Sequence, residues 1–231
     1  MGLEYSKTAV SIVDRGLAES IATIASLLWW LYVICGLFIS WVVKYYRDDL
    51  KPGYRVWSLP SWRDVLFLVW VWVLSGTSLA FLGILEQPVV SGFNFIATEF
   101  SWRLLFWASL EEVLRAGVFD MFRGSLGLSV LANSAVFGVC HLGDDVERIA
   151  NTPMYAVFFP LAGMAIGIAL LAILVRMGLV WAIMVHFCVN TFRLVLLTSD
   201  GILNYLIFFA SIGLLIYISF PSLRGYSKKL S

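Results

Sequence analysis

Long apolar runs alternate with short polar or aromatic stretches along most of this chain. A membrane-spanning helix needs about 20 predominantly apolar residues, because the hydrocarbon core of a bilayer is about 30 Å thick. The pattern predicts seven such helices, over residues 22–43, 65–85, 103–122, 124–143, 154–176, 179–197 and 201–220. We therefore expect an all-α fold, a polytopic transmembrane helical bundle of about seven spans, with an eighth span as the alternative.

Ionisable residues interrupt three of these apolar runs. Glu111, Glu112 and Arg115 lie in the third run, and the two histidines of the chain, His141 and His186, lie in the fourth and sixth. Ionisable groups are costly in hydrocarbon, so they usually face a bundle interior or a wet cavity and mark functional sites. The pattern predicts a buried polar site to which three helices contribute.

Composition agrees with a membrane location. The chain of 231 residues is 61% hydrophobic and 13% charged, whereas soluble domains average about 45–50% apolar and about 25% charged residues. The formal net charge of +1 gives no basic footprint for a nucleic acid. We expect the lipid bilayer as the surroundings and no nucleic-acid partner.

The basic residues are distributed unevenly among the predicted loops. Five lysines and arginines lie in loop 44–64, and three more follow residue 220. An odd number of spans places this loop and the C-terminal tail on the same side of the membrane. The positive-inside rule then predicts an external N-terminus and a cytoplasmic C-terminus.

The chain shows no low-complexity tract and no soluble domain. We divide it into N-terminal helices and surface loops (residues 1–100), a core carrying the ionisable residues (101–200), and a last span with a basic tail (201–231).

The third run contains two adjacent carboxylates that can take different roles. Successive side chains of a helix are about 100° apart, so Glu111 and Glu112 cannot point at one spot. Arg115 follows Glu111 by four residues and Glu112 by three, so it can reach either. One carboxylate can pair with Arg115 and stay ionised, while the other serves as a general base or acid. The alternative is a buried ion pair that only fixes helix packing.

The sixth run adds an amide to the candidate site. Asn190 follows His186 by four residues and shares its helix face. An amide N–H is a good donor to a developing oxyanion, although buried amides also form interhelical hydrogen bonds. Residue types and spacing alone leave hydrolysis, metal binding and proton relay open.

Three motifs, in this order along the chain, resemble those of the CAAX prenyl protease and bacteriocin-processing (CPBP or Abi) family of intramembrane glutamate proteases, and in particular the type II CAAX endopeptidases. The resemblance covers roughly residues 105–197. It rests on Glu111-Glu112, on Phe137-x-x-x-His141 and on His186-x-x-x-Asn190. The family's first motif usually reads E-E-x-x-x-R, but here residue 116 is Ala and the arginine is residue 115.

The resemblance implies an intramembrane endopeptidase acting on a membrane-associated protein or peptide, with a prenylated C-terminus as one substrate class. Glu111 would activate a water molecule, and His141 would hold that water or polarise the reacting carbonyl. His186 and Asn190 would stabilise the oxyanion. Glu112 and Arg115 would be supporting residues.

Two other function classes stay open at this point. One is a non-enzymatic immunity or binding protein that retains the fold, and the other is a proton-coupled transporter, since intramembrane Glu and His also serve proton relays. No cofactor is firmly predicted. Zn²⁺ is an alternative, because two histidines and a glutamate can bind it with a water at the open position.

Overall fold

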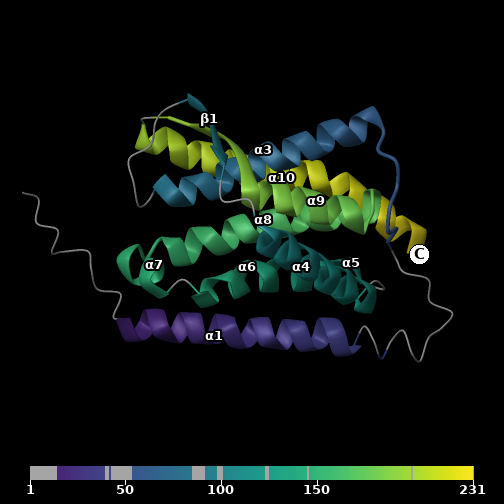
Figure 1. The fold of residues 1–231 in the computed structure, drawn as a ribbon, viewed down its shortest axis with the longest axis horizontal. Coiled ribbons are helices and arrows are strands. Elements are labelled where there is room, and N and C mark those ends of the chain that lie inside the picture. The colour runs from purple at the N-terminus through teal and green to yellow at the C-terminus, as the bar shows by residue number, and fades with distance from the viewer. Residues whose placement is uncertain are drawn as a thin grey trace, which may run out of the picture.

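In the computed structural model the apolar runs form helices that lie side by side along one common axis (Figure 1). The structure describes residues 15–39, 42, 54–84, 92–97, 101–122, 125–144, 146–198 and 200–230. The longer helices are α1 (Arg15–Ile34), α3 (Trp62–Ile84), α4 (Trp102–Met121), α8 (Tyr155–Arg176), α9 (Leu179–Thr191) and α10 (Gly201–Leu230). The first residues of α1 and the C-terminus lie at opposite ends of the molecule (Figure 1).

Shorter segments complete the helical part of the fold. A π-helical turn, η1 (Cys35–Ile39), continues α1. The fourth predicted run forms one continuous helical rod of four segments, which precedes the short helix α7 (Val146–Asn151). These four segments are α5 (Leu126–Val130), the π-helical η2 (Leu131–Val136), α6 (Phe137–Cys140) and the 3-10 turn η3 (His141–Asp144).

Five helical segments of the described chain are long and apolar enough to cross a membrane. They are Arg15–Phe38, Trp62–Leu82, Leu126–Gly143, Tyr155–Arg176 and Gly201–Tyr226. The chain is therefore a multi-pass integral membrane protein with a mainly helical fold, as predicted. The predicted number of seven spans is not shown.

The other two predicted spans do not qualify, one because its helix is too polar and the other because its helix is too short. Residues 103–122 do form a helix, α4, but it carries five charged residues and is too polar to qualify by composition. The prediction of a helix over residues 179–197 is wrong in its last part. There α9 ends at Thr191 after 13 residues, and a strand, β2 (Phe192–Leu197), follows.

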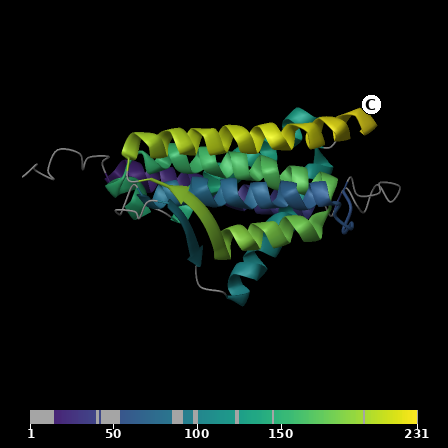
Figure 2. The same cartoon turned by 90° about the horizontal axis from the view of Figure 1, so that it is seen from above.

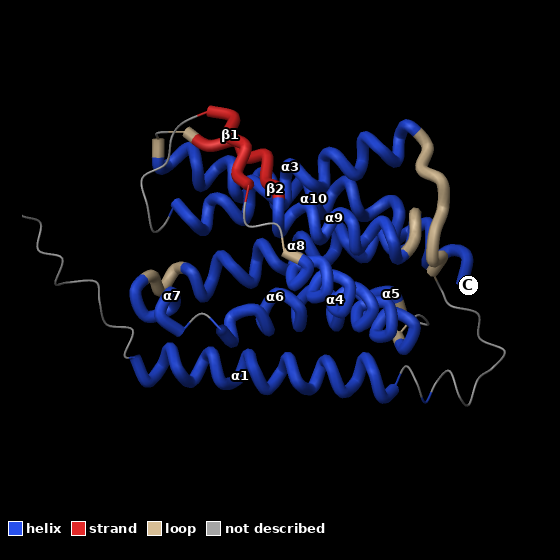
Figure 3. The backbone as a smooth tube through the Cα atoms, viewed as in Figure 1, coloured by secondary structure: helices blue, strands red, loops and turns tan. Residues whose placement is uncertain are grey.

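The strand β2 pairs with β1 (Gly92–Ala97) in a two-stranded antiparallel sheet at one edge of the bundle (Figure 3). In the register, Gly92 faces Leu197 and Ala97 faces Phe192. Side chains of α3 contact the backbone of β2: the Trp72 indole N–H donates to the Phe192 carbonyl, and the Leu196 N–H donates to the Thr77 hydroxyl. Long-range pairing thus gives this apolar segment its extended conformation.

The helix α8 forms the centre of the bundle, and its residues from Ala169 to Leu174 are completely buried. Figure 2 shows α10 along one face of the molecule, with α9 and α4 toward the opposite face. A core cluster of apolar side chains from α3, α4, α8, α9 and α10 surrounds the second half of α8. The burial of α8 explains its uniformly apolar sequence, because no side of this helix needs a polar face.

Glycines let α8 approach the rod that carries His141. A Cβ atom at Gly163 would lie 2.8 Å from the Gly138 Cα, and one at Gly138 would lie 2.6 Å from the Pro160 carbonyl oxygen. One turn later, a Cβ at Gly167 would lie 3.3 Å from Nη1 of Arg115. Gly163 and Gly167 form the G-x-x-x-G pattern that allows close backbone packing of membrane helices. This packing brings η2 and α6 against α8 beside the ionisable residues.

Candidate active site

The ionisable residues of the three predicted helices meet in one cluster. Glu111, Glu112 and Arg115 come from α4, His141 from the junction of α6 and η3, and His186 from α9. The sequence-based expectation that three helices share one polar site is therefore met in the structure. What each residue does in that site stays a prediction.

Arg115 pairs with Glu112 and not with Glu111. Its Nε lies 3.0 Å from one Glu112 carboxylate oxygen and 3.2 Å from the other, and both side chains are completely buried. Its Nη1 donates to the carbonyl oxygen of Asn133 at 2.9 Å, and its guanidinium carbon lies 4.0 Å from the centre of the Phe137 ring. A buried charge is tolerated when it is paired and hydrogen-bonded, and this surrounding structure holds the guanidinium beside Glu112.

His186 lies between the two glutamates. Its Nδ1 is 2.8 Å from a Glu112 carboxylate oxygen, and its Nε2 is 3.4 Å from Oε2 of Glu111. His141 approaches Glu111 from the other helix, with Nε2 at 3.6 Å from the same Oε2, while its Nδ1 is 2.7 Å from the Phe137 carbonyl oxygen. Both imidazoles thus direct Nε2 toward one carboxylate oxygen.

The hydrogen-bond partners of the two rings indicate their tautomers. A carbonyl oxygen and an ionised carboxylate only accept hydrogen bonds, so each Nδ1 carries the hydrogen. In a neutral ring Nε2 is then an acceptor. Glu111 Oε2 faces both Nε2 atoms, at 3.6 Å from His141 and 3.4 Å from His186. A protonated ring can donate to this carboxylate oxygen, whereas a neutral ring and the carboxylate can both accept from a donor such as water.

The two glutamates differ sharply in accessibility. The Glu112 side chain is 0% exposed, whereas the side chains of Glu111 and His141 are 14% and 31% exposed. Glu111 and His141 therefore reach the surface of the protein in part, and Glu112 does not. The adjacent carboxylates thus have two different environments: Glu112 is held by Arg115 and His186, and Glu111 lies at the more exposed side of the cluster.

Asn190 lies one turn beyond His186 on α9, and its side chain is half-buried. The ion pairs described above join the five ionisable residues of the cluster and do not include Asn190. The role of Asn190 as an oxyanion donor stays a prediction.

Three residues of the cluster's surroundings, Trp29, Tyr32 and Asn133, were not expected from the sequence. The Tyr32 hydroxyl of α1 donates to the side-chain oxygen of Asn133 at 3.1 Å, and the Asn133 amide donates to the Ser129 carbonyl oxygen at 2.8 Å. The Trp29 ring of the same helix lies edge-on to His141, with 6.3 Å between ring centres. An asparagine inside an apolar run was the available signal for Asn133, whereas nothing in the spacing singled out Tyr32.

The cluster holds two histidines and a glutamate, a donor set that zinc accepts, so the placement of these side chains decides whether they fit a metal. A catalytic zinc ion takes three protein ligands and a water. Among the parts of the chain that the structure describes, no group of three or more His, Cys, Asp or Glu side chains is placed to hold a metal ion. The zinc alternative stays a prediction.

Part of the chain matches a known protein family. Residues 80–192 match the family described as type II CAAX prenyl endopeptidase Rce1-like. The matched region runs from the last turn or two of α3 to the first residue of β2 and includes all five clustered residues and Asn190. No curated protein and no solved structure matches the chain. The motifs, the buried glutamate and histidine cluster and this match agree that residues 80–192 form an Rce1-like type II CAAX prenyl endopeptidase domain of the CPBP family.

Proposed function

We propose that the protein is an intramembrane endopeptidase that hydrolyses a peptide bond of a membrane-associated substrate through a water activated by Glu111. The family consists of endopeptidases, which supports this class of reaction. The single observation that carries the residue assignment is the unequal environment of the two glutamates. Glu112 is fully buried and bonded to Arg115 and His186, whereas Glu111 is accessible and lies within 3.6 Å of both histidine Nε2 atoms.

In the proposed reaction, a water bound beside Glu111 and His141 loses a proton to the Glu111 carboxylate. Its oxygen attacks the carbonyl carbon of the scissile peptide, and the carbonyl oxygen becomes an oxyanion. Asn190 can donate to that oxyanion through its amide, and His186 can donate through Nε2 when its ring carries both protons. The C–N bond then breaks as Glu111 returns the proton to the leaving amine.

Glu112 and Arg115 act in this scheme as positioning residues. The Glu112 carboxylate accepts from Nδ1 of His186, which fixes the ring orientation and keeps Nε2 directed at Glu111. Arg115 in turn holds Glu112 through its Nε and is anchored on the Asn133 carbonyl. We propose that these linked contacts, from Asn133 through Arg115 to Glu112, keep Nε2 of His186 in place.

We further propose that α4 and α9 also cross the membrane, so that the chain crosses it seven times together with the five long apolar helices. The charges that make α4 too polar by composition are largely those of the buried cluster, so they need not face lipid. The helix α9 is short, but β2 continues it, and the β1 pairing and the α3 side chains bond backbone groups that lipid could not satisfy.

The experiment that tests the proposed activity uses the purified full chain reconstituted in lipid vesicles. Three peptides are offered separately: one ending in a prenylated cysteine motif, the same peptide without the prenyl group, and a bacterial-type leader peptide. Mass spectrometry identifies the products. We expect cleavage of at least one peptide, and a fall of about 10²–10⁴-fold in Glu111→Gln, the usual contribution of a general base.

Glu147→Gln is the matched control, because Glu147 lies on α7 with its side chain exposed and outside the cluster. It should cleave like the wild type. If Glu111→Gln cleaves as fast as Glu147→Gln, Glu111 is not the general base. If folded wild-type protein cleaves nothing but binds a peptide, the immunity or binding class is favoured. Proton uptake into vesicles that depends on a transported solute would favour the transporter.

The same preparation tests metal dependence. Our scheme needs no metal, so treatment with a strong zinc chelator should leave the cleavage rate unchanged. A loss of activity that is restored by added Zn²⁺ would contradict the scheme and support the metal alternative.

A further inference from the structure

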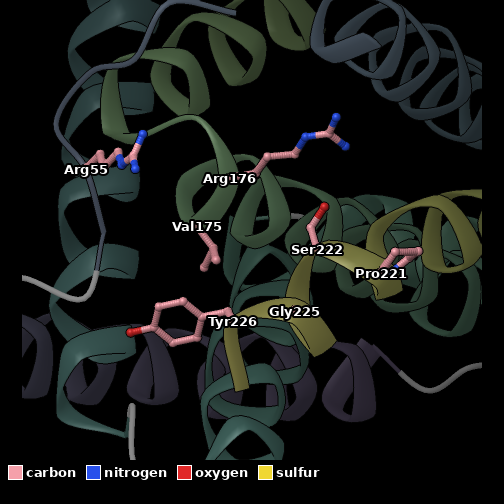
Figure 4. Close-up of a pocket in the computed structure, with 7 residues that line it drawn as sticks. All are labelled: Arg55, Val175, Arg176, Pro221, Ser222, Gly225 and Tyr226. Atoms are coloured by element: carbon pink, nitrogen blue, oxygen red, sulfur yellow. The ribbon is translucent and has the colours of Figure 1, made fainter. Parts of the chain in front are cut away.

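A second site lies at the end of the bundle where α8 and α10 finish. A cavity of about 410 Å³ opens there, lined by Arg55, Val175, Arg176, Pro221, Ser222, Gly225 and Tyr226. These side chains come from three separate segments: the polar stretch before α3, the last turn of α8 and the C-terminal part of α10 (Figure 4). The volume falls within the range of about 300–1,000 Å³ typical of small-molecule sites.

The segment that carries Arg55 is fixed by its backbone. The Leu179 N–H donates to the Arg55 carbonyl at 2.9 Å, and the Val180 N–H donates to the Val56 carbonyl at 3.1 Å. Gly178 adopts φ +112°, and a Cβ atom there would lie 2.7 Å from the Arg55 carbonyl oxygen. Only glycine allows this close approach without strain. The position of Arg55 beside the cavity is therefore built into the turn between α8 and α9.

The cavity is positively charged. Arg55 and Arg176 line it, and the lining residues include no carboxylate. The acidic group that faces Arg176 is Asp64, whose Oδ1 lies 2.5 Å from the Arg176 Nε. The lining itself thus carries two guanidinium groups and no carboxylate, with Asp64 beside Arg176 and Asp120 near Tyr54 outside it. Guanidinium groups match phosphate oxygens in geometry and charge, and the Ser222 hydroxyl adds a neutral donor.

Aromatic residues place this cavity at the level of lipid headgroups. Trp57 and Trp181 stack with 5.2 Å between ring centres, and the Trp181 indole N–H donates to the Ser58 carbonyl. Trp62, at the start of α3, is 68% exposed. Tryptophan is enriched at the interface between the hydrocarbon core and water. Arg176 ends one of the five long apolar helices, so the cavity lies where such a helix leaves the hydrocarbon.

We propose that this cavity binds the phosphate-bearing headgroup of an anionic phospholipid, with Arg55 and Arg176 as its charge partners. Basic pockets between membrane helices on the cytoplasmic side bind such headgroups, and the positive-inside pattern predicts that this end of the molecule faces the cytoplasm. Phe220, which precedes the lining residue Pro221 on α10, is exposed and offers an apolar surface for the acyl chains. The lipid would tie the segment before α3 to the ends of α8 and α10.

The test measures lipid retention by the purified full chain with native mass spectrometry, independently of any enzymatic activity. The detergent-solubilised protein is titrated with phosphatidylglycerol and, separately, with phosphatidylcholine. We expect preferential retention of phosphatidylglycerol, and a loss of affinity of about 10-fold in Arg55→Gln, since hydrogen bonds to charged groups are among the stronger ones. Arg63→Gln is the control, because Arg63 lies nearby over the Trp62 ring but does not line the cavity.

A second variant tests the proposal independently, in case Arg55→Gln does not fold. Asp64→Asn combined with Arg176→Gln removes both partners of the ion pair and should weaken retention to a similar extent. Equal retention by the wild type, Arg55→Gln and this double variant would overturn the proposal. Inorganic phosphate or glycerol phosphate that binds as tightly as the lipid would also overturn it, because the ligand would then be a free phosphate.

Discussion

At the residue scale, two neighbouring glutamates acquire different properties because their partners differ. Sequence spacing allowed Arg115 to reach either carboxylate. The choice falls on Glu112 because the guanidinium is anchored by the carbonyl of Asn133 and packed over Phe137. Those anchors are distant in sequence from Arg115, so residue spacing within α4 could not reveal them. The sequence could identify the residues of the cluster but not their pairing.

Substitution of the two glutamates should affect stability very differently. Glu112→Gln leaves the fully buried Arg115 without its carboxylate, and breaking a buried ion pair typically costs about 3–5 kcal/mol. Glu111→Gln removes a charge that is partly accessible and unpaired with arginine, so the free energy of unfolding should change by much less. Denaturant titration in detergent measures both. Equal destabilisation by the two variants would contradict the assignment of Arg115 to Glu112.

Tyr32 tests the contribution of α1 to the cluster. Tyr32→Phe removes the hydroxyl that donates to Asn133 but keeps the ring, so we expect a loss of about 0.5–1.5 kcal/mol in stability. Tyr217→Phe is the control, because Tyr217 is largely exposed on α10. Thermal unfolding of both variants provides the comparison. If the two variants unfold at the same temperature as the wild type, the Tyr32 hydrogen bond contributes nothing measurable.

At the scale of elements, the apolar pattern predicted helices well where they pack against other helices. It failed at residues 192–197, because a short apolar run does not distinguish a buried helix from a strand. The partner strand, at residues 92–97, is about a hundred positions earlier in the chain. Local periodicity cannot predict this pairing, because the two strands are far apart in the sequence. The glycines of α8 illustrate the opposite case, since their G-x-x-x-G spacing is visible in the sequence.

Gly163→Ala should disrupt the packing of α8 on α6. The added methyl group would lie 2.8 Å from the Cα of Gly138, so the helices must separate, and overpacking of this kind costs about 1–3 kcal/mol. Gly213→Ala is the matched control on α10, where nothing lies within 4 Å of the new Cβ. It should be neutral or stabilising, because alanine favours helices. Denaturant titration that finds Gly163→Ala as stable as Gly213→Ala would contradict the close contact.

At the scale of the whole molecule, the fold brings α4, α9 and the α5–α6 rod together around one cluster. The sequence identified these three segments because each carries ionisable residues within an apolar run. The fold also brings the basic segment before α3 to the ends of α8 and α10, as the predicted sidedness of the loops requires. The uneven distribution of basic residues predicts which end faces the cytoplasm, and this orientation stays a prediction.

Cysteine labelling in intact cells tests that orientation. The three native cysteines are replaced, and single cysteines are introduced at Asn151, an exposed residue of α7, and at Gly225 of α10. The helix α7 and the C-terminal end of α10 lie at opposite ends of the bundle (Figure 1). We expect a membrane-impermeant reagent added outside to label the cysteine at 151 and not the one at 225. The reverse pattern would invert the proposed topology.

The most direct test of the proposed activity compares newly formed peptide termini in membranes from cells that make the wild type, Glu111→Gln or Glu147→Gln at equal levels. Terminal-peptide mass spectrometry detects the new terminus of any cleaved membrane protein, whatever the substrate is. The proposed mechanism predicts at least one new terminus that is present with the wild type and Glu147→Gln and absent with Glu111→Gln. Identical termini in all three samples, with all three proteins folded and abundant, would contradict an endopeptidase that depends on Glu111.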